Sequence, residues 1–259
     1  MNGLFDVSTL DAGHFNAVYN VLSFGFASML ATTIYLYISQ ARVLPKYRQA
    51  IVISGTVTLI ALYHYWRIFD SFVAAHADKT IEFNEAYRYV DWLLTVPLLL
   101  METIAVLNLP KGERKSLISR LVPASAFMII LGYPGEIATD NGPKMMWGAL
   151  STLPFLYILY ILFVELTKSL ESQPSEVADT VKRLRLLLIA TWGVYPISFL
   201  LPVIMGDSAG GASAFVGRQV GYTVADVLAK CLFGLTIYKI ARLKSAADDA
   251  AYASAEGMH

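Results

Sequence analysis

Three charged side chains capable of proton or carbonyl chemistry stand in stretches of the sequence that are otherwise apolar. Asp91 and Glu102 lie in RYVDWLLTVPLLLMETI, residues 88–104, and Lys230 follows Asp226 by four positions in a second such stretch. A charge at the centre of a membrane helix costs roughly 2.5 to 3.5 kcal/mol on insertion scales. We therefore expect these groups to pair or to do chemistry: carboxyl groups carry protons, and a desolvated lysine forms Schiff bases with carbonyl compounds.

The spacing within 88–104 places several polar groups on one side of a helix. At about 100° per residue, Asp91, Thr95 and Glu102 fall within about 40° of one another, and Arg88 lies on the same side. A rise of about 1.5 Å per residue separates Asp91 from Glu102 by about 16 Å along the axis. The sequence thus predicts an ordered row of titratable groups across a membrane.

The lysine has two interpretations on position alone. Asp226 and Lys230 stand at i and i+4, so they share a helix face and could form a structural ion pair. The other interpretation is a covalent attachment point, because the neutral amine of a desolvated lysine reacts with carbonyl compounds. The rest of the chain has to decide between them.

Composition places the chain in the membrane class. Of its 259 residues, 56% are hydrophobic and 15% charged, and the mean hydropathy is +0.53, outside the range of ordinary soluble proteins. We expect a multi-pass protein of the cell membrane, surrounded by the lipid bilayer. A net charge of zero without a basic patch argues against nucleic-acid binding. A single cysteine, Cys231, excludes an internal disulfide and a CxxC metal site, and we expect no metal.

Seven apolar stretches are long enough to cross a bilayer, which takes about 20 residues each. They lie near residues 14–40, 47–74, 86–107, 117–138, 144–168, 183–205 and 216–241. The breaks between them are short and polar or rich in Pro and Gly, so no linker separates a second domain. The sequence predicts an all-α bundle of seven transmembrane helices, a single domain over 1–259, with a disordered tail at 245–259.

Lysine and arginine are unevenly divided between the two ends of this predicted bundle. Fourteen of the 20 lie in or beside the first, third and fifth connections and at the C-terminal end. They are Arg42, Lys46, Arg48, Lys111, Arg114, Lys115, Arg120, Lys168, Lys182, Arg183, Arg185, Lys239, Arg242 and Lys244. Because basic residues are in excess on the cytoplasmic side, we expect the N-terminus outside and the C-terminus in the cytoplasm.

Three fragments carry a family resemblance. RYVDWLLTVPLLLMET, WGVYPISFLLP and DVLAK resemble, in order, the third, sixth and seventh helices of microbial rhodopsins. YHYWRIFDSF, GYPGEI and MMWGALSTLPFLYILY resemble more narrowly the xanthorhodopsin-like group of bacterial proton pumps. With the seven-span layout, the resemblance extends over most of the chain.

The resemblance implies a role for each intramembrane charge. Lys230 would bind all-trans retinal as a protonated Schiff base, with Asp91 as proton acceptor and Asp226 as a second counterion. Glu102 matches the proton donor, and a carboxyl buried among apolar residues is expected to keep its proton at neutral pH. Arg88 and Thr95, on the same helix face, complete the predicted proton path.

His64, in YHYWR, matches a histidine that pairs with the acceptor aspartate in the xanthorhodopsin-like group. The resemblance therefore implies a contact between His64 and Asp91. An isolated histidine within a membrane span could equally be a satisfied hydrogen-bonding residue between helices. Both interpretations stay open at this point.

A set of mostly aromatic residues matches the family's retinal-lining positions. Aromatic residues at helical spacing are more often plain core, so the resemblance alone assigns them to a cofactor pocket. Leu99 matches the position that tunes colour, where leucine implies absorption of green light. The remaining predicted lining residues are Trp92, Met128, Gly132, Trp192, Tyr195, Pro196, Phe199 and Tyr222.

Gly148 stands where bacteriorhodopsin-type pumps carry a tryptophan beside the retinal ring. Loss of the indole would open a lateral window towards lipid, and in the xanthorhodopsin-like group this glycine makes room for a carotenoid antenna. The alternative is close helix packing, for which small residues are common in membranes. A carotenoid is therefore a second cofactor that the resemblance suggests.

The chain departs from bacteriorhodopsin-type pumps near the last outer loop. Those pumps carry two extracellular glutamates as a proton-release group, whereas this loop offers only Asp207, and Arg218 stands near a place where glutamate would be expected. We therefore expect proton release late in the cycle, from Asp91 itself.

The combination of Asp91, Thr95 and Glu102 favours a light-driven outward proton pump, an ion transporter and not an enzyme. By resemblance, chloride pumps lack the acceptor carboxylate, sodium pumps carry Asn and Gln at the first and third positions, and many sensors lack the carboxylic donor. The alternatives are a sensory rhodopsin and a seven-helix transporter or receptor without a chromophore. We also expect a homo-oligomer.

Overall fold

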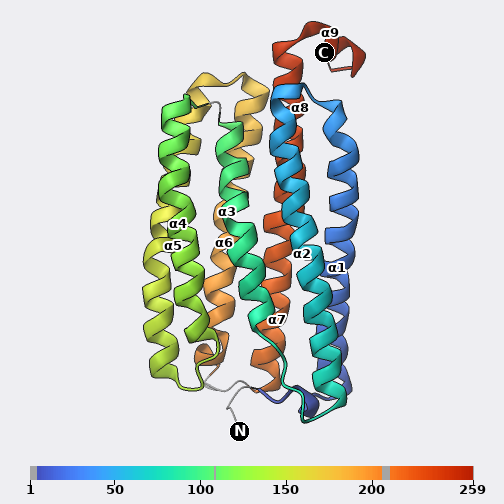
Figure 1. Ribbon diagram of the computed structural model, residues 1–259, viewed down its shortest axis with the longest axis vertical. Helices are drawn as coiled ribbons and strands as arrows, with labels where there is room; N and C mark the ends of the chain where they lie inside the picture. Colours follow the sequence, from blue (N-terminus) through green and yellow to red (C-terminus); the bar gives the residue numbers. More distant parts are fainter. Residues whose placement is uncertain (1–4, 108, 206–210, 259) are drawn as a thin grey trace.

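The computed structural model describes residues 5–107, 109–205 and 211–258, most of which are helical (Figure 1). Within these residues, seven spans are long and apolar enough to cross a membrane, which confirms the predicted seven-helix architecture. Six spans are the helices α1 (Ala12–Ser39), α2 (Pro45–Ala77), α3 (Ala86–Val106), α4 (Lys111–Glu136), α5 (Asn141–Ser169) and α6 (Ser175–Ile204). The seventh combines α7 (Ala212–Asp226), the π-helical turn η4 (Val227–Leu232) and α8 (Phe233–Asp248).

Several helices begin earlier than hydropathy predicts. The apolar stretches start near residues 117 and 183, but α4 begins at Lys111 and α6 at Ser175. Pro110 and Pro174 precede these helices in extended conformation and set their starts. The added first turns contain Lys, Arg and Glu, which are good helix formers but leave no hydropathy signal.

The spans form a closed bundle in which α3 and the seventh span are deeply buried. Each of α1 to α6 packs against the next, and α7 closes the ring against α1 and α6. The start of α1 and the end of α8 lie at opposite ends of the bundle, at the bottom and the top of Figure 1. We call these the N-terminal end and the C-terminal end of the bundle.

The polarity of the bundle is that of a membrane protein. Large apolar side chains such as Ile38, Leu153 and Ile204 are more than half exposed, as expected of helices that face lipid. Charged side chains including Arg88, Asp91, Glu102 and Lys230 are buried between the helices. The interior therefore holds the groups that a bilayer would reject.

The tail at 245–259, for which the sequence predicts disorder, contains helices in its described part, residues 245–258. α8 continues to Asp248, and a further short helix, α9 (Ala250–Ala255), follows, capped by the Asp249 side chain. Beyond α9, Glu256 accepts hydrogen bonds from Arg42 and Arg242, both at 2.8 Å. The Ala-rich composition suggested disorder because it gave no sign of these contacts with the first connection and with α8.

Candidate functional site

The centre of the bundle holds a lysine between two carboxylates. Lys230 Nζ lies 2.7 Å from Asp91 Oδ2 and 2.5 Å from Asp226 Oδ1, and each of the three side chains is only 1% exposed. Asp91 lies on α3, Asp226 is the last residue of α7, and Lys230 lies in η4. A buried cation is tolerable only beside anions, so the two carboxylates explain how Lys230 is held there.

The Asp226 carboxylate is firmly held. It accepts hydrogen bonds from Trp92 Nε1 at 3.0 Å, Tyr195 OH at 2.8 Å and Tyr65 OH at 2.9 Å. Arg88 Nη1 adds an ion pair at 3.5 Å. Hydrogen bonds to the charged form of a carboxylate favour that form, so this geometry keeps Asp226 as an anion.

Asp91 has far fewer partners. Its Oδ2 contacts Lys230, whereas its buried Oδ1 has no hydrogen-bond partner. Thr95 donates to the main-chain oxygen of Asp91 at 2.8 Å and not to the carboxylate. Of the two carboxylates beside Lys230, Asp91 is therefore the one with free capacity to accept a proton.

Glu102 is completely buried on the same helix, towards the C-terminal end of the bundle. Ser54 Oγ lies within hydrogen-bonding distance of both Glu102 Oε2 and the Ala50 main-chain oxygen, the latter at 3.2 Å. A serine hydroxyl has one hydrogen and cannot donate to both oxygens at once. Both contacts are satisfied when Glu102 carries a proton and donates to Ser54, and Ser54 donates to Ala50.

His64 is buried on α2, but the structure records no hydrogen bond between it and Asp91. Its Nδ1 has no partner, and its ring meets Tyr63 edge-on at a centroid distance of 5.2 Å. The predicted pairing of His64 with Asp91 is therefore not among the contacts of the site. Asp207, the carboxylate noted in the last loop, lies outside the described residues.

A largely apolar cavity adjoins Lys230. It has an empty volume of about 810 Å³, part of which is open to the outside. All ten residues predicted to line a retinal pocket, Gly148 included, border it together with Lys230. They are Trp92, Leu99, Met128, Gly132, Gly148, Trp192, Tyr195, Pro196, Phe199 and Tyr222. An apolar cavity that reaches a buried lysine amine fits a hydrophobic carbonyl compound such as retinal.

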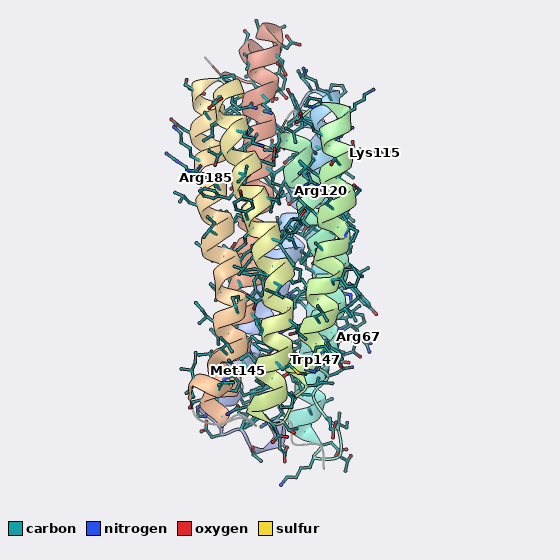
Figure 2. All side chains as sticks on the ribbon, turned by 90° about the vertical axis from the view of Figure 1, so that its left-hand side faces the viewer. Arg67, Lys115, Arg120, Met145, Trp147 and Arg185 are labelled. Carbon is teal, nitrogen blue, oxygen red and sulfur yellow. The ribbon has the colours of Figure 1, made fainter. Side chains whose placement is uncertain are left out.

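The wall of this cavity at Gly148 is tightly packed. A Cβ built on Gly148 would lie 2.7 Å from Cε1 of Phe199, so no larger side chain fits unless the ring moves. α5 carries Gly148, and this helix is the least buried of the seven spans. Figure 2 shows this side of the bundle, with Trp147, the neighbour of Gly148, in its lower half.

Sequence reasoning missed several polar residues of the site. Tyr65 and Ser54, which bind Asp226 and Glu102, look like ordinary core residues in the sequence. Glu85 and Glu136 form ion pairs with Arg218 near the N-terminal end of the bundle. The available signal for both glutamates was a carboxylate at the edge of an apolar span, which is too common to single out.

Comparisons with known proteins agree with this geometry. Residues 16–243 match the model of the bacteriorhodopsin-like protein family. The chain is 44% identical to xanthorhodopsin, described as a light-driven ion pump with dual chromophore, with a TM-score of 0.85 over 92% of this chain and 97% of that one. It is 41% identical to thermophilic rhodopsin, with a TM-score of 0.86 over 92% and 98% of the two chains.

A third relative is the green-light absorbing proteorhodopsin of gamma-proteobacterium EBAC31A08. It is 31% identical over 218 residues, which cover 83% of this chain and 82% of that protein. The family model covers most of the chain, and the spans and the lysine-centred cavity agree with it. The chain therefore belongs to the bacteriorhodopsin-like family of microbial rhodopsins, membrane-embedded light-driven ion transporters that bind retinal covalently.

Proposed function

We propose that this protein is a light-driven outward proton pump with retinal bound at Lys230. The observation that carries the proposal is the position of Lys230 between a firmly held carboxylate, Asp226, and a sparsely bonded one, Asp91. When bound, retinal supplies light absorption and a light-driven change in the proton affinity of the Lys230 nitrogen. The residues of the chain then determine where the proton goes.

The first transfer runs from Lys230 Nζ to Asp91 Oδ2, which lie 2.7 Å apart. This is within hydrogen-bonding reach, as direct proton transfer requires. Asp226 stays an anion because Trp92, Tyr195 and Tyr65 donate to it. The proton is therefore directed to Asp91 and not to its neighbour.

Glu102 resupplies the proton from the other side. Its contacts with Ser54 fit a neutral carboxylic acid, and it makes no ion pair among the described residues. About 16 Å of helix separates it from Asp91, at about 1.5 Å per residue, too far for one hydrogen bond. We therefore expect water to enter between Glu102 and Lys230 during the cycle and to carry the proton.

The direction of transport follows from the orientation of the bundle. Most lysines and arginines gather at the C-terminal end, and Lys115, Arg120 and Arg185 lie in the upper half of Figure 2. If that end is cytoplasmic, as the positive-inside rule predicts, Glu102 faces the cytoplasm and Asp91 the exterior. Protons then leave the cell.

The deciding experiment measures the pH of an unbuffered suspension of cells that make the protein with added retinal, under green light. Acidification that a protonophore abolishes is the expected result. Alkalinisation that the protonophore enhances would mean that another ion is transported and protons follow passively. No pH change in coloured cells would favour a sensor, and colourless cells would favour a chromophore-free transporter or receptor.

We further propose a carotenoid antenna at the wall of the cavity formed by Gly148. In support, Gly148 borders the cavity, and the relative that shares 44% identity is described as having a dual chromophore. In cells supplied with a carotenoid, pumping should be driven by light in the carotenoid band, and Gly148→Trp should remove that band while retinal absorption remains. Identical action spectra with and without carotenoid would contradict the antenna and leave close packing of Gly148 against Phe199 as its role.

A further inference from the structure

A lysine that the proposed proton path does not use is buried near the C-terminal end of the bundle. Lys244 lies on α8 and is only 5% exposed, although lysine is almost never fully buried unless it is paired. Its ammonium donates a hydrogen bond to the main-chain oxygen of Val106, the last residue of α3, at 2.6 Å. Lys244 therefore joins the seventh span to the end of α3.

The Lys244 ammonium has few partners for a buried cation. An ammonium has three hydrogens to donate, and Val106 is the one hydrogen-bond acceptor that the described residues offer to it. Asp248, one turn further along α8, instead forms an ion pair with Lys46 at 2.7 Å and accepts a hydrogen bond from Tyr47. The charges of Asp248 and Lys46 act on Lys244 at longer range and oppose each other. In the described part of the chain, Lys244 is thus a buried cation without an ion pair.

The type of this residue matters as much as its place. A buried ammonium without an anion is costly, and the ion avoids that cost when it gives up its proton. The hydrogen bond to Val106 offsets part of the cost, because a cation is stabilised at the C-terminus of a helix, where main-chain oxygens lack partners. An arginine could cap α3 in the same way, but it would not release a proton. The property that distinguishes Lys244 at this position is therefore its ability to lose and regain a proton.

Lys244 lies between the predicted proton donor and the C-terminal end of the bundle. Glu102 precedes Val106 by one turn of α3, about 6 Å along the axis and on the same helix face. The seventh span also packs beside the donor, since a Cβ on Gly234 of α8 would lie 3.3 Å from Cβ of Ser54, the serine in contact with Glu102. A proton that moves from the C-terminal end to Glu102 would therefore pass the Lys244 ammonium.

We propose that Lys244 relays protons from the C-terminal end of the bundle to Glu102. The inference rests on the proposed function, in which Glu102 gives up its proton towards Lys230 in each cycle. Glu102 is then a carboxylate, and Lys244 passes one proton to it through water: one N–H bond of Lys244 breaks and one O–H bond of Glu102 forms. The neutral amine of Lys244 next takes one proton from water on the C-terminal side. Both groups thus regain the protons with which the cycle began.

Replacement of Lys244 by arginine distinguishes a proton relay from a helix cap. Lys244→Arg keeps the positive charge and a donor for Val106, but arginine does not release its proton. Time-resolved infrared spectroscopy of the retinal-bound protein after a flash follows the carboxyl band of Glu102, which should disappear and return. In Lys244→Arg and Lys244→Met the return should be slower by about 10²-fold. Lys239→Arg and Lys239→Met, at an exposed position on the same helix, should keep the wild-type rate.

A small diffusible acid gives a second readout. Hydrazoic acid, present when azide is added, can carry protons to Glu102 without Lys244 and should restore the fast return in Lys244→Arg. A wild-type rate in Lys244→Arg without azide would show that Lys244 only caps α3, which would overturn the relay and leave the proposed pump intact. A slow return that azide does not restore would also overturn the relay, because the defect would then lie in the structure around Glu102. A wild-type Glu102 band that never changes would instead refute the donor role of Glu102, and the relay with it.

Discussion

Asp91 and Asp226 contact the same lysine nitrogen, yet their surroundings differ. Asp226 accepts from two tyrosines and a tryptophan, whereas one oxygen of Asp91 has no partner. Hydrogen bonds to a carboxylate stabilise its charged form, so we expect these two residues of one type to have different roles. The sequence predicts both charges but not this difference, because the donors come from other spans.

Asp91→Asn should abolish pumping and move the absorption maximum to the red. The amide cannot take the proton from Lys230, and the loss of a negative charge 2.7 Å from the nitrogen removes stabilisation of its positive charge. The measurements are light-driven pH change and the absorption spectrum. Asp70→Asn, at an exposed position on α2, is the matched control and should behave as the wild type. Normal pumping by Asp91→Asn would remove Asp91 from the acceptor role.

Glu102→Gln should slow the return of the proton to the Lys230 nitrogen without a change of colour. A positioned proton donor typically contributes about 10²- to 10⁴-fold in rate, and Glu102 is not among the residues that line the cavity beside Lys230. Flash photolysis measures the recovery rate. Glu113→Gln, at the exposed start of α4, should leave it unchanged. A recovery equally fast in Glu102→Gln would point to a different donor.

At the scale of elements, hydropathy predicts the seven spans because each must match the thickness of a bilayer. It does not predict the N-terminal ends of α4 and α6, where stretches with charged residues add the first turns. It also does not predict the helices of the tail, beyond which Glu256 accepts a hydrogen bond from Arg42. The ion pairs of Glu85 and Glu136 are missed for the same reason. Such contacts depend on which helices become neighbours, and the choice of neighbours cannot be predicted from the local sequence.

The contact between α1 and α2 bears directly on the site. A Cβ on Gly25 of α1 would lie 2.7 Å from Cδ1 of Tyr65 and 3.0 Å from Cγ2 of Thr223. Tyr65 has little freedom to move, because its hydroxyl donates to Asp226. The glycine thus allows the two helices to approach closely enough for this hydrogen bond.

Gly25→Ala should destabilise the protein by about 1–3 kcal/mol, as overpacking of a dense core does, and should shift the absorption maximum by displacing Tyr65. Gly193→Ala is the matched control, since a Cβ there meets no atom within 4 Å. It should be neutral or stabilising by up to about 1 kcal/mol, because alanine favours a helix over glycine. Thermal bleaching in detergent measures both variants. Equal bleaching temperatures for Gly25→Ala and Gly193→Ala would show that Tyr65 can move at little cost in stability.

At the scale of the whole molecule, buried charges are ordered along the bundle. The Glu85–Glu136–Arg218 cluster lies near the N-terminal end, Lys230 with its two aspartates in the middle, and Glu102 towards the C-terminal end. In the proposed pump this order would give the proton path a beginning and an end, and the orientation in the membrane would set its direction. The expected homo-oligomer has no bearing on this order and stays a prediction.

The orientation can be measured with introduced cysteines, because the natural cysteine is not exposed to a labelling reagent. Cys231 is buried, so a cysteine introduced at an exposed position is the site that a membrane-impermeant maleimide labels in intact cells. Lys79 lies between α2 and α3 at the N-terminal end, and Lys115 lies in the first turns of α4 at the opposite end. Lys79→Cys should be labelled from outside and Lys115→Cys only after the cells are opened, because basic residues concentrate on the cytoplasmic side. The reverse pattern would place Glu102 towards the exterior, and the same sequence of proton transfers would then move protons into the cell.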